Sequence, residues 1–158
     1  MKAKYFLIAF LFISFTVFAQ EKKVPKAVKD SFSKLYPKVT DVKWDKEGKA
    51  EYEAGFKENG KDVSVVFDEK GNLIETETAI QISELPKSVA PFVEKNYAGF
   101  KITEAAKIVN AKGEVTYEAE ITKGKVKKDL LFDANGKPEK KDVNKEKENE
   151  KEDEEDKD

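Results

Sequence analysis

The strongest constraint on the fold of this chain is an internal repeat. Tyr52-Glu53-Ala54 returns as Tyr117-Glu118-Ala119, and Phe67-Asp68-x-x-Gly71 returns as Phe132-Asp133-x-x-Gly136, in both cases after 65 residues. A repeated segment of this kind is one supersecondary unit that buries its apolar face beside its twin. We therefore expect the chain to fold as two copies of one small unit.

Each copy, at residues 24–77 and 85–142, reads as one helix followed by four strands. Proline stands near the start of both helices, as Pro25 and Pro86, where its missing N–H costs nothing. Apolar residues then recur at helical spacing: Ala27, Val28, Phe32, Leu35 and Tyr36 in the first copy, and Val89, Phe92, Val93 and Tyr97 in the second. Alternation of apolar and charged residues predicts the strands, and glycine turns such as Asn59-Gly60 predict hairpins. The expected fold class is α+β, an antiparallel sheet of about eight strands with the helices packed on one face.

The two faces of this sheet have different chemistry. In the second strand of each copy, the apolar residues of the alternating pattern face the helix. The charged residues that alternate with them therefore face water: Glu51 and Glu53 in the first copy, Glu118 and Glu120 in the second. Residues 78–84 join the copies and are too short and too apolar for a free linker. The sequence therefore predicts one compact body over residues 20–142.

Residues 1–19 have the pattern of a signal peptide. Lys2 and Lys4 precede an apolar run of 14 residues, and Val17-Phe18-Ala19 supplies a cleavage site. The run falls short of the ~20 residues that a spanning helix needs, and no cysteine follows it for a lipid anchor. We expect the mature protein to be periplasmic or secreted, with no membrane attachment after cleavage.

Charge separates the body from the C-terminal end. Residues 139–158 carry 11 acids and 6 lysines, whereas residues 20–138 carry 21 acids and 22 lysines. Nothing in the nearly neutral body resembles the basic stripe of a nucleic-acid-binding protein. Residues 143–158 have almost nothing to bury, and we expect them to form a disordered acidic tail.

Deleting residues 143–158 is expected to leave the melting temperature within about one or two degrees of wild type, since no apolar area is buried there. Thermal denaturation followed by circular dichroism measures the difference. A large loss of stability would show that the tail docks on the body.

The sequence contains neither cysteine nor histidine, and this excludes several kinds of chemistry. A thiol nucleophile, a serine-histidine triad and an ordinary zinc site all need one of these residues. Arginine is absent too, so the planar fork that grips phosphate or carboxylate is missing. We expect a protein that is not an enzyme and that carries no cofactor.

Three groups of residues are candidate functional residues. Trp44, the only tryptophan, either packs in the core or forms a partly exposed binding anchor. Glu51, Glu53, Glu118 and Glu120 either bind calcium or act as acid and base, or they simply form a solvated face among lysines. Asp68 and Asp133 precede turn glycines without a calcium-loop pattern, which favours a turn-stabilising role.

The chain resembles the PepSY-like family of small exported bacterial proteins, whose fold is similar to that of the beta-lactamase inhibitory protein. The residues that carry the resemblance are Val24-Pro25, Leu85-Pro86, Val42-Lys43-Trp44 with Gly48, Tyr52-Glu53-Ala54, Asn59-Gly60 and Phe67-Asp68-x-x-Gly71-Asn72-Leu73. The second copy departs from this pattern. It has no tryptophan at the position equivalent to Trp44, and it has Pro138 at the position equivalent to the apolar Leu73. The resemblance implies an exported α+β protein without assigned catalytic residues, with an inhibitory or protein-binding role for the open face of the sheet.

Residues and resemblance together predict a non-catalytic exported binding module that engages a periplasmic or secreted protein through the open sheet face. The alternative is a small-ligand or calcium-binding domain that uses the carboxylates of the same face. We expect a monomer.

Overall fold

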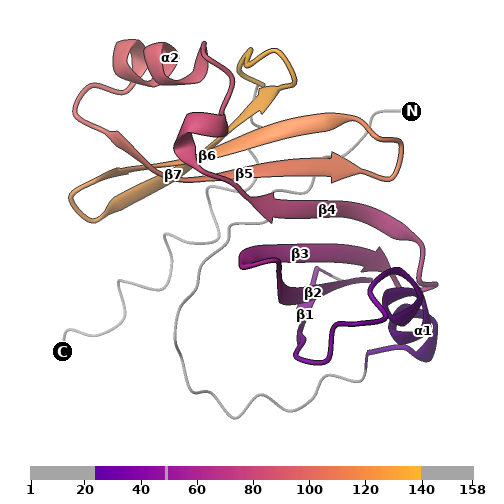
Figure 1. Cartoon of the computed structure of the whole chain (residues 1–158). Coiled ribbons are helices and arrows are strands. Elements are labelled where there is room, and N and C mark those ends of the chain that lie inside the picture. Colours follow the sequence, from indigo (N-terminus) through magenta and orange to yellow (C-terminus); the bar gives the residue numbers. More distant parts are fainter. Residues whose placement is uncertain (1–23, 49, 140–158) are drawn as a thin grey trace, which may run out of the picture.

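The computed structural model describes residues 24–48 and 50–139, which form one antiparallel sheet with two helices (Figure 1). The seven strands lie in sequence order across the sheet. The first copy supplies α1 (Lys26–Leu35), β1 (Lys43–Glu47), β2 (Glu51–Glu58), β3 (Lys61–Asp68) and β4 (Leu73–Ala79). The second supplies α2 (Val89–Asn96), β5 (Lys101–Asn110), β6 (Val115–Lys123) and β7 (Val126–Asp133), and a short 3-10 helix, η1 (Ile82–Glu84), joins the copies. The expected signal peptide and acidic tail lie outside the described residues.

The predicted α+β class is confirmed, but the fourth strand of the second copy is reduced to a single bridge. Pro138 pairs with Phe132 in an isolated antiparallel bridge. The amide of Glu139 then donates to the carbonyl of Leu131 at 2.8 Å. Proline has no N–H to give to a ladder, which explains why the pairing is confined to one position in this copy. Within residues 24–48 and 50–139 the sheet therefore has seven strands, where about eight were expected.

Both helices cover the same face of the sheet, each over its own copy. Helix α1 and the strands that it covers form a cluster of fully or nearly fully buried side chains: Val28, Phe32, Ala54, Phe56, Val63, Val65 and Phe67. Under α2 lies its counterpart: Leu85, Val89, Val93, Ala105, Ala119, Ile121 and Phe132. The strand members of these clusters are the predicted apolar phase, so alternation correctly identified the core. Burial of these side chains is the main driving force for folding.

The repeated Phe-Asp-x-x-Gly segments form equivalent turns. Asp68 Oδ1 accepts hydrogen bonds from the amides of Lys70 and Asn72 at 2.8 and 2.9 Å. In the second copy, Asp133 Oδ1 accepts from the amides of Asn135 and Lys137 at 2.8 and 3.0 Å. The turn-stabilising role predicted for both aspartates is thus confirmed.

Gly71 has φ +82° and lies against α1, where a β carbon would come within 2.5 Å of the carbonyl oxygen of Ala27. Gly60 has φ +79° in the β2–β3 turn, but a β carbon added there would meet no atom within 4 Å. We expect Gly60→Ala to cost about 1–2 kcal/mol through its left-handed backbone alone. Gly71→Ala should cost about 1–3 kcal/mol more, because α1 must also move. Urea denaturation of both variants measures the difference, and equal losses would contradict close packing at Gly71.

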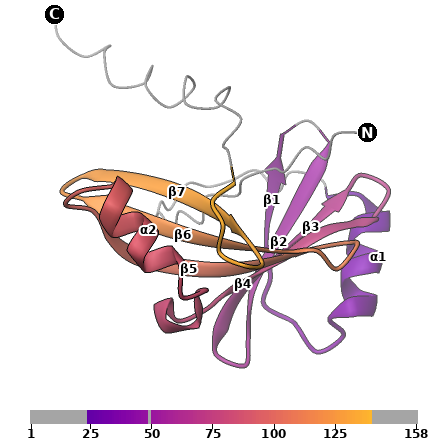
Figure 2. The ribbon, with the colours of Figure 1, turned by 90° about the horizontal axis from the view of Figure 1, so that it is seen from above.

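The two copies are joined by pairing between β4 and β5, with Glu75–Ala79 in register with Ala106–Asn110. The sheet is therefore continuous, and Figure 2 shows how strongly it twists between β1 and β7. The connection between the copies is ordered: the Gln81 amide donates to Glu84 Oε2 at 2.8 Å at the start of η1.

Helix α2 begins at Val89, later than Pro86, and accommodates Pro91 in its first turn, where an N–H is not needed.

Candidate functional site

The face of the sheet opposite the helices, called the open face below, is strongly acidic. Strand alternation and register place on it Asp45, Glu47, Glu51, Glu53, Asp62, Glu75, Glu77, Glu104, Glu118, Glu120 and Asp129. Fewer lysines share this face, among them Lys43, Lys57 and Lys127. The body is nearly neutral in total, but its acidic side chains are concentrated on this face, which total composition could not reveal.

The middle of the open face is buried, contrary to the expectation of a solvated surface. Glu77 is 2% exposed, Glu118 5%, Glu75 7% and Glu120 7%. The expectation failed because alternation fixes which face a residue occupies but not how the twisted sheet and η1 shape that face. Buried carboxylates are rare in proteins unless they are paired or functional, so this part of the sheet is our candidate site.

A hollow of about 660 Å³ opens at this part of the face, between the strands and the connection that contains η1. Its acidic lining comes from Asp62, Glu77, Glu104, Glu118, Glu120 and Asp129. Ala79, Ile80, Ile82 and Ala106 add apolar walls. Among the described residues that line the hollow there is no lysine, so its interior favours positive charge.

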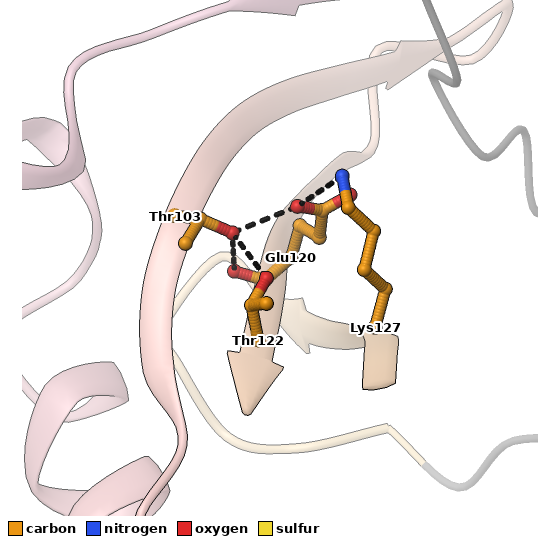
Figure 3. Close-up of polar contacts among 4 residues, drawn as sticks. All are labelled: Thr103, Glu120, Thr122 and Lys127. Carbon is orange, nitrogen blue, oxygen red and sulfur yellow. Dashed lines mark hydrogen bonds and ion pairs between the residues drawn. The ribbon is translucent and has the colours of Figure 1, made fainter. Parts of the chain in front are cut away.

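Glu120 shows how a carboxylate is satisfied at this site (Figure 3). Thr103 Oγ1 donates to Glu120 Oε1 at 2.7 Å and lies 2.9 Å from Thr122 Oγ1. Lys127 Nζ lies 3.1 and 3.0 Å from the two carboxylate oxygens. A β-bulge between Ile102 and Glu104 coincides with the position of Thr103. Glu120 is therefore held by a hydroxyl and an ammonium group, each from a neighbouring strand.

Glu75 and Glu77 lack this kind of compensation. Glu75 Oε1 and Glu77 Oε2 are buried without a hydrogen-bond partner. Burial, followed by the charges of Glu51 and Glu53, raises the pKa of Glu75 to about 7. Burial also raises the pKa of Glu77 to about 8, with the charges of Glu53, Glu75 and Asp129 acting in the same direction. Both side chains are consequently protonated to a large extent near neutral pH.

Glu53 connects this pair to the first copy. Burial raises its pKa, while a hydrogen bond from the Ser64 hydroxyl acts in the opposite direction. Ser64 is 0% exposed and lies directly opposite Glu77 in the β3–β4 register. The carboxyl groups of both copies thus form one continuous acidic surface through β4.

The structure brings together four of the five candidate residues named from sequence. Glu118 and Glu120 line the hollow, and Glu51 and Glu53 lie on the same face in β2. Trp44 lies on the opposite face, packed against the α1 cluster with its ring centroid 5.3 Å from that of Phe32 in an edge-to-face arrangement. Its side chain remains partly exposed at the edge of the sheet.

Sequence reasoning missed Glu75 and Glu77, which stand at the centre of the site. The signal was present, since Glu75-Thr76-Glu77 alternates in the same way as Glu51-Tyr52-Glu53 and Glu118-Ala119-Glu120. It was overlooked because threonine in the helix-facing phase makes the strand look less amphipathic. Thr103 and Asp129 carried no local signal and enter the site only through strand pairing.

In the part of the chain that the structure describes, no group of three or more acidic side chains has an arrangement able to hold a metal ion. The glutamates share one face but do not converge on one point, as calcium coordination requires.

Comparison with known proteins identifies the class. A family model described as "Putative beta-lactamase-inhibitor-like, PepSY-like" matches residues 16–75 and 50–139. These overlapping matches span both copies and most of the chain, and the protein belongs to the PepSY-like family. None of the curated proteins matches the chain.

Crystal structures of similar proteins come from Bacteroides. A BLIP-like protein from Bacteroides fragilis is 31% identical, with a TM-score of 0.58 over 75% of this chain and 86% of that chain. A DUF2874 family protein from Bacteroides ovatus is 26% identical, with a TM-score of 0.63 over 73% and 84%. A protein from Bacteroides eggerthii, described among "putative periplasmic proteins", shares the fold at 21% identity, with a TM-score of 0.66 over 74% and 86%. None of the helices within residues 24–48 and 50–139 has the length and apolar character needed to cross a membrane.

Proposed function

We propose that this protein is a non-catalytic exported module that binds a partner protein against the open face of its sheet. The observation that carries the proposal is the burial on that face of Glu75 and Glu77, each with one carboxyl oxygen that has no hydrogen-bond partner. Burying a carboxyl group costs free energy unless it is paired, so this arrangement works against folding. Features that oppose stability occur mainly where function requires them.

The similarity to the BLIP-like protein of Bacteroides fragilis supports the same function. The helices cover the other face, so the open face is the large surface that the fold leaves for a partner. Ile82, 44% exposed at the hollow, adds apolar contact area of the kind that interface centres use. Where the covered surface of the partner includes an active site, binding inhibits it.

Affinity capture from a periplasmic extract of the producing cells tests this function with three baits. Glu53→Lys reverses a charge on the open face, and Glu94→Lys makes the same change on the exposed side of α2. We expect wild type and Glu94→Lys to capture the same protein, and Glu53→Lys to lose it at least about tenfold, as like-charge contacts cost several kcal/mol. Capture that is equal for all three baits, or no capture by wild type, would reject the open face as the binding surface.

A further inference from the structure

The hollow at η1 has features beyond those of a general docking face. Six acidic residues line it, together with Ala79, Ile80, Ile82 and Ala106. This combination of carboxyl groups and short apolar side chains matches a ligand that has a positive end and an aliphatic stem. A purely apolar ligand would bring no donor to the carboxyl groups, and a small inorganic cation would not use the apolar walls.

Glu77 provides a second observation, independent of the acidic lining. It is only 2% exposed, lines the hollow, and its Oε2 atom has no hydrogen-bond partner. Buried polar atoms in native proteins are almost always satisfied, so an orphan oxygen at a hollow indicates a group that is supplied from outside. An ionised carboxyl group only accepts hydrogen bonds, so the group that satisfies ionised Glu77 is a donor, and beside so many carboxyl groups a positively charged donor is favoured.

Lys127 shows that the site accepts an ammonium group. Its Nζ atom lies within 3.1 Å of both Glu120 oxygens, while its side chain remains 49% exposed. The hydrogen bond with Glu120 raises the pKa of Lys127, which keeps its ammonium group charged. Glu120 thus already accepts hydrogen bonds from an ammonium group of this chain, whereas Glu77, which is more deeply buried in the hollow, does not.

We infer that the hollow anchors a lysine side chain from a loop of the partner protein, with Glu77 receiving its ammonium group. This inference rests on the proposed function. A lysine fits because its stem can lie along Ala79 and Ile82 while its three N–H donors reach acceptors from different strands. The planar fork of arginine instead prefers one carboxylate approached from one side. Residues 139–158 of this chain, with 11 acids against 6 lysines, have a net charge of the same sign as the lining of the hollow.

Titration of the isotope-labelled full-length mature protein, followed by NMR amide shifts, tests the inference. The probes are the peptide acetyl-Gly-Lys-Gly-amide and its neutral counterpart with norleucine in place of lysine, at pH 8. We expect the lysine peptide to shift the amides of Ala79, Thr103 and Ala106, and the norleucine peptide to leave them unchanged. Glu77→Gln, which keeps the shape of the side chain, should weaken binding of the lysine peptide about tenfold, as loss of a charge-assisted hydrogen bond does.

Two further variants serve as controls. Glu94→Gln makes the same chemical change on the exposed side of α2 and should leave the affinity unchanged. Ala79→Leu fills the hollow without changing charge and should also abolish the shifts. Ionisation of Glu77 by the bound ammonium should release a proton at pH 7, seen as a buffer-dependent heat in calorimetry. The groups that face Glu77 and raise its pKa are Glu53, Glu75 and Asp129.

The remaining outcomes overturn the inference. Equal binding of the norleucine peptide would make the hollow an apolar site, and full affinity of Glu77→Gln would remove Glu77 from it. Binding of 1,5-diaminopentane without binding of the lysine peptide would show a small-amine site and not a partner anchor. The proposed function fails separately, because the capture experiment detects a partner on the open face whether or not that partner places a lysine in the hollow.

Discussion

Replacing Phe132 by alanine is expected to lower the free energy of unfolding of the whole protein by about 3–5 kcal/mol. Phe132 is 0% exposed in the α2 cluster, and its ring packs edge-on against Phe92 with centroids 5.5 Å apart. The large effect combines lost burial with the cavity that the smaller side chain leaves. Val126→Ala is the matched control, because Val126 lies in the same strand but is 51% exposed and should change stability by less than about 0.5 kcal/mol.

The same variant tests whether the two copies unfold together. The structure gives each copy its own helix and buried cluster, but joins them in one sheet through β4 and β5. We expect one cooperative transition in urea, shifted as a whole by Phe132→Ala, when tryptophan fluorescence and circular dichroism are compared. Trp44 reports on the first copy only, so a shift in its fluorescence transition requires coupling between the copies. Two transitions, only one of which moves, would show independent units.

Separate expression of residues 20–82 and 83–142 tests whether either copy can fold without the other. Cutting between β4 and β5 exposes unpaired N–H and C=O groups along Glu75–Ala79 and Ala106–Asn110. Each piece also has only about sixty residues, a size at which burial is marginal. We expect the pieces to be molten or to aggregate, and dispersed NMR spectra for either one would contradict this.

A second large effect is expected in the pH dependence of stability. The pKa of Glu75 is raised to about 7 and that of Glu77 to about 8 by burial, from 4.5 in each case. The folded state therefore binds more protons than the unfolded state between these values. The contribution of these two groups to stability is fully present below pH 4.5 and is lost as the pH rises through 7 and 8. We expect a loss on the order of a few kcal/mol between about pH 5.5 and pH 9, measured by urea denaturation.

Glu77→Gln isolates the contribution of one carboxyl group to this loss. The variant cannot ionise, so it should equal wild type at about pH 5.5 and be clearly more stable at about pH 9. Its remaining pH dependence reports on Glu75 and Glu53, whose pKa values are also raised. Glu94→Gln, on the exposed side of α2, should keep the wild-type profile. A flat profile for wild type would mean that Glu75 and Glu77 ionise normally and that the open face is more solvated than the structure shows.

Local sequence patterns determined the parts of this protein that depend on short-range physics. Glycine and aspartate predicted the turns at Asp68 and Asp133, and period-two alternation predicted the strand face that meets the helices, where Ala54, Phe56 and Phe132 are buried. These predictions succeeded because the backbone of a turn and the pleat of a strand are set within a few residues. The repeat then indicated two equivalent units, and the absence of cysteine and histidine limited the chemistry.

Tertiary structure alone decided the character of the open face. Alternation placed Glu118 and Glu120 away from the helices but could not show that they are buried, nor that Glu75 and Glu77 lie between the glutamates of the two copies. Solvent access there depends on the twist of seven strands and on where η1 lies, and both arise from contacts distant in sequence. The pKa of a carboxyl group follows that access, because desolvation is the largest cause of the shifts at Glu75 and Glu77. The sequence therefore determined which residues face the site, and the packed sheet determined what they can bind.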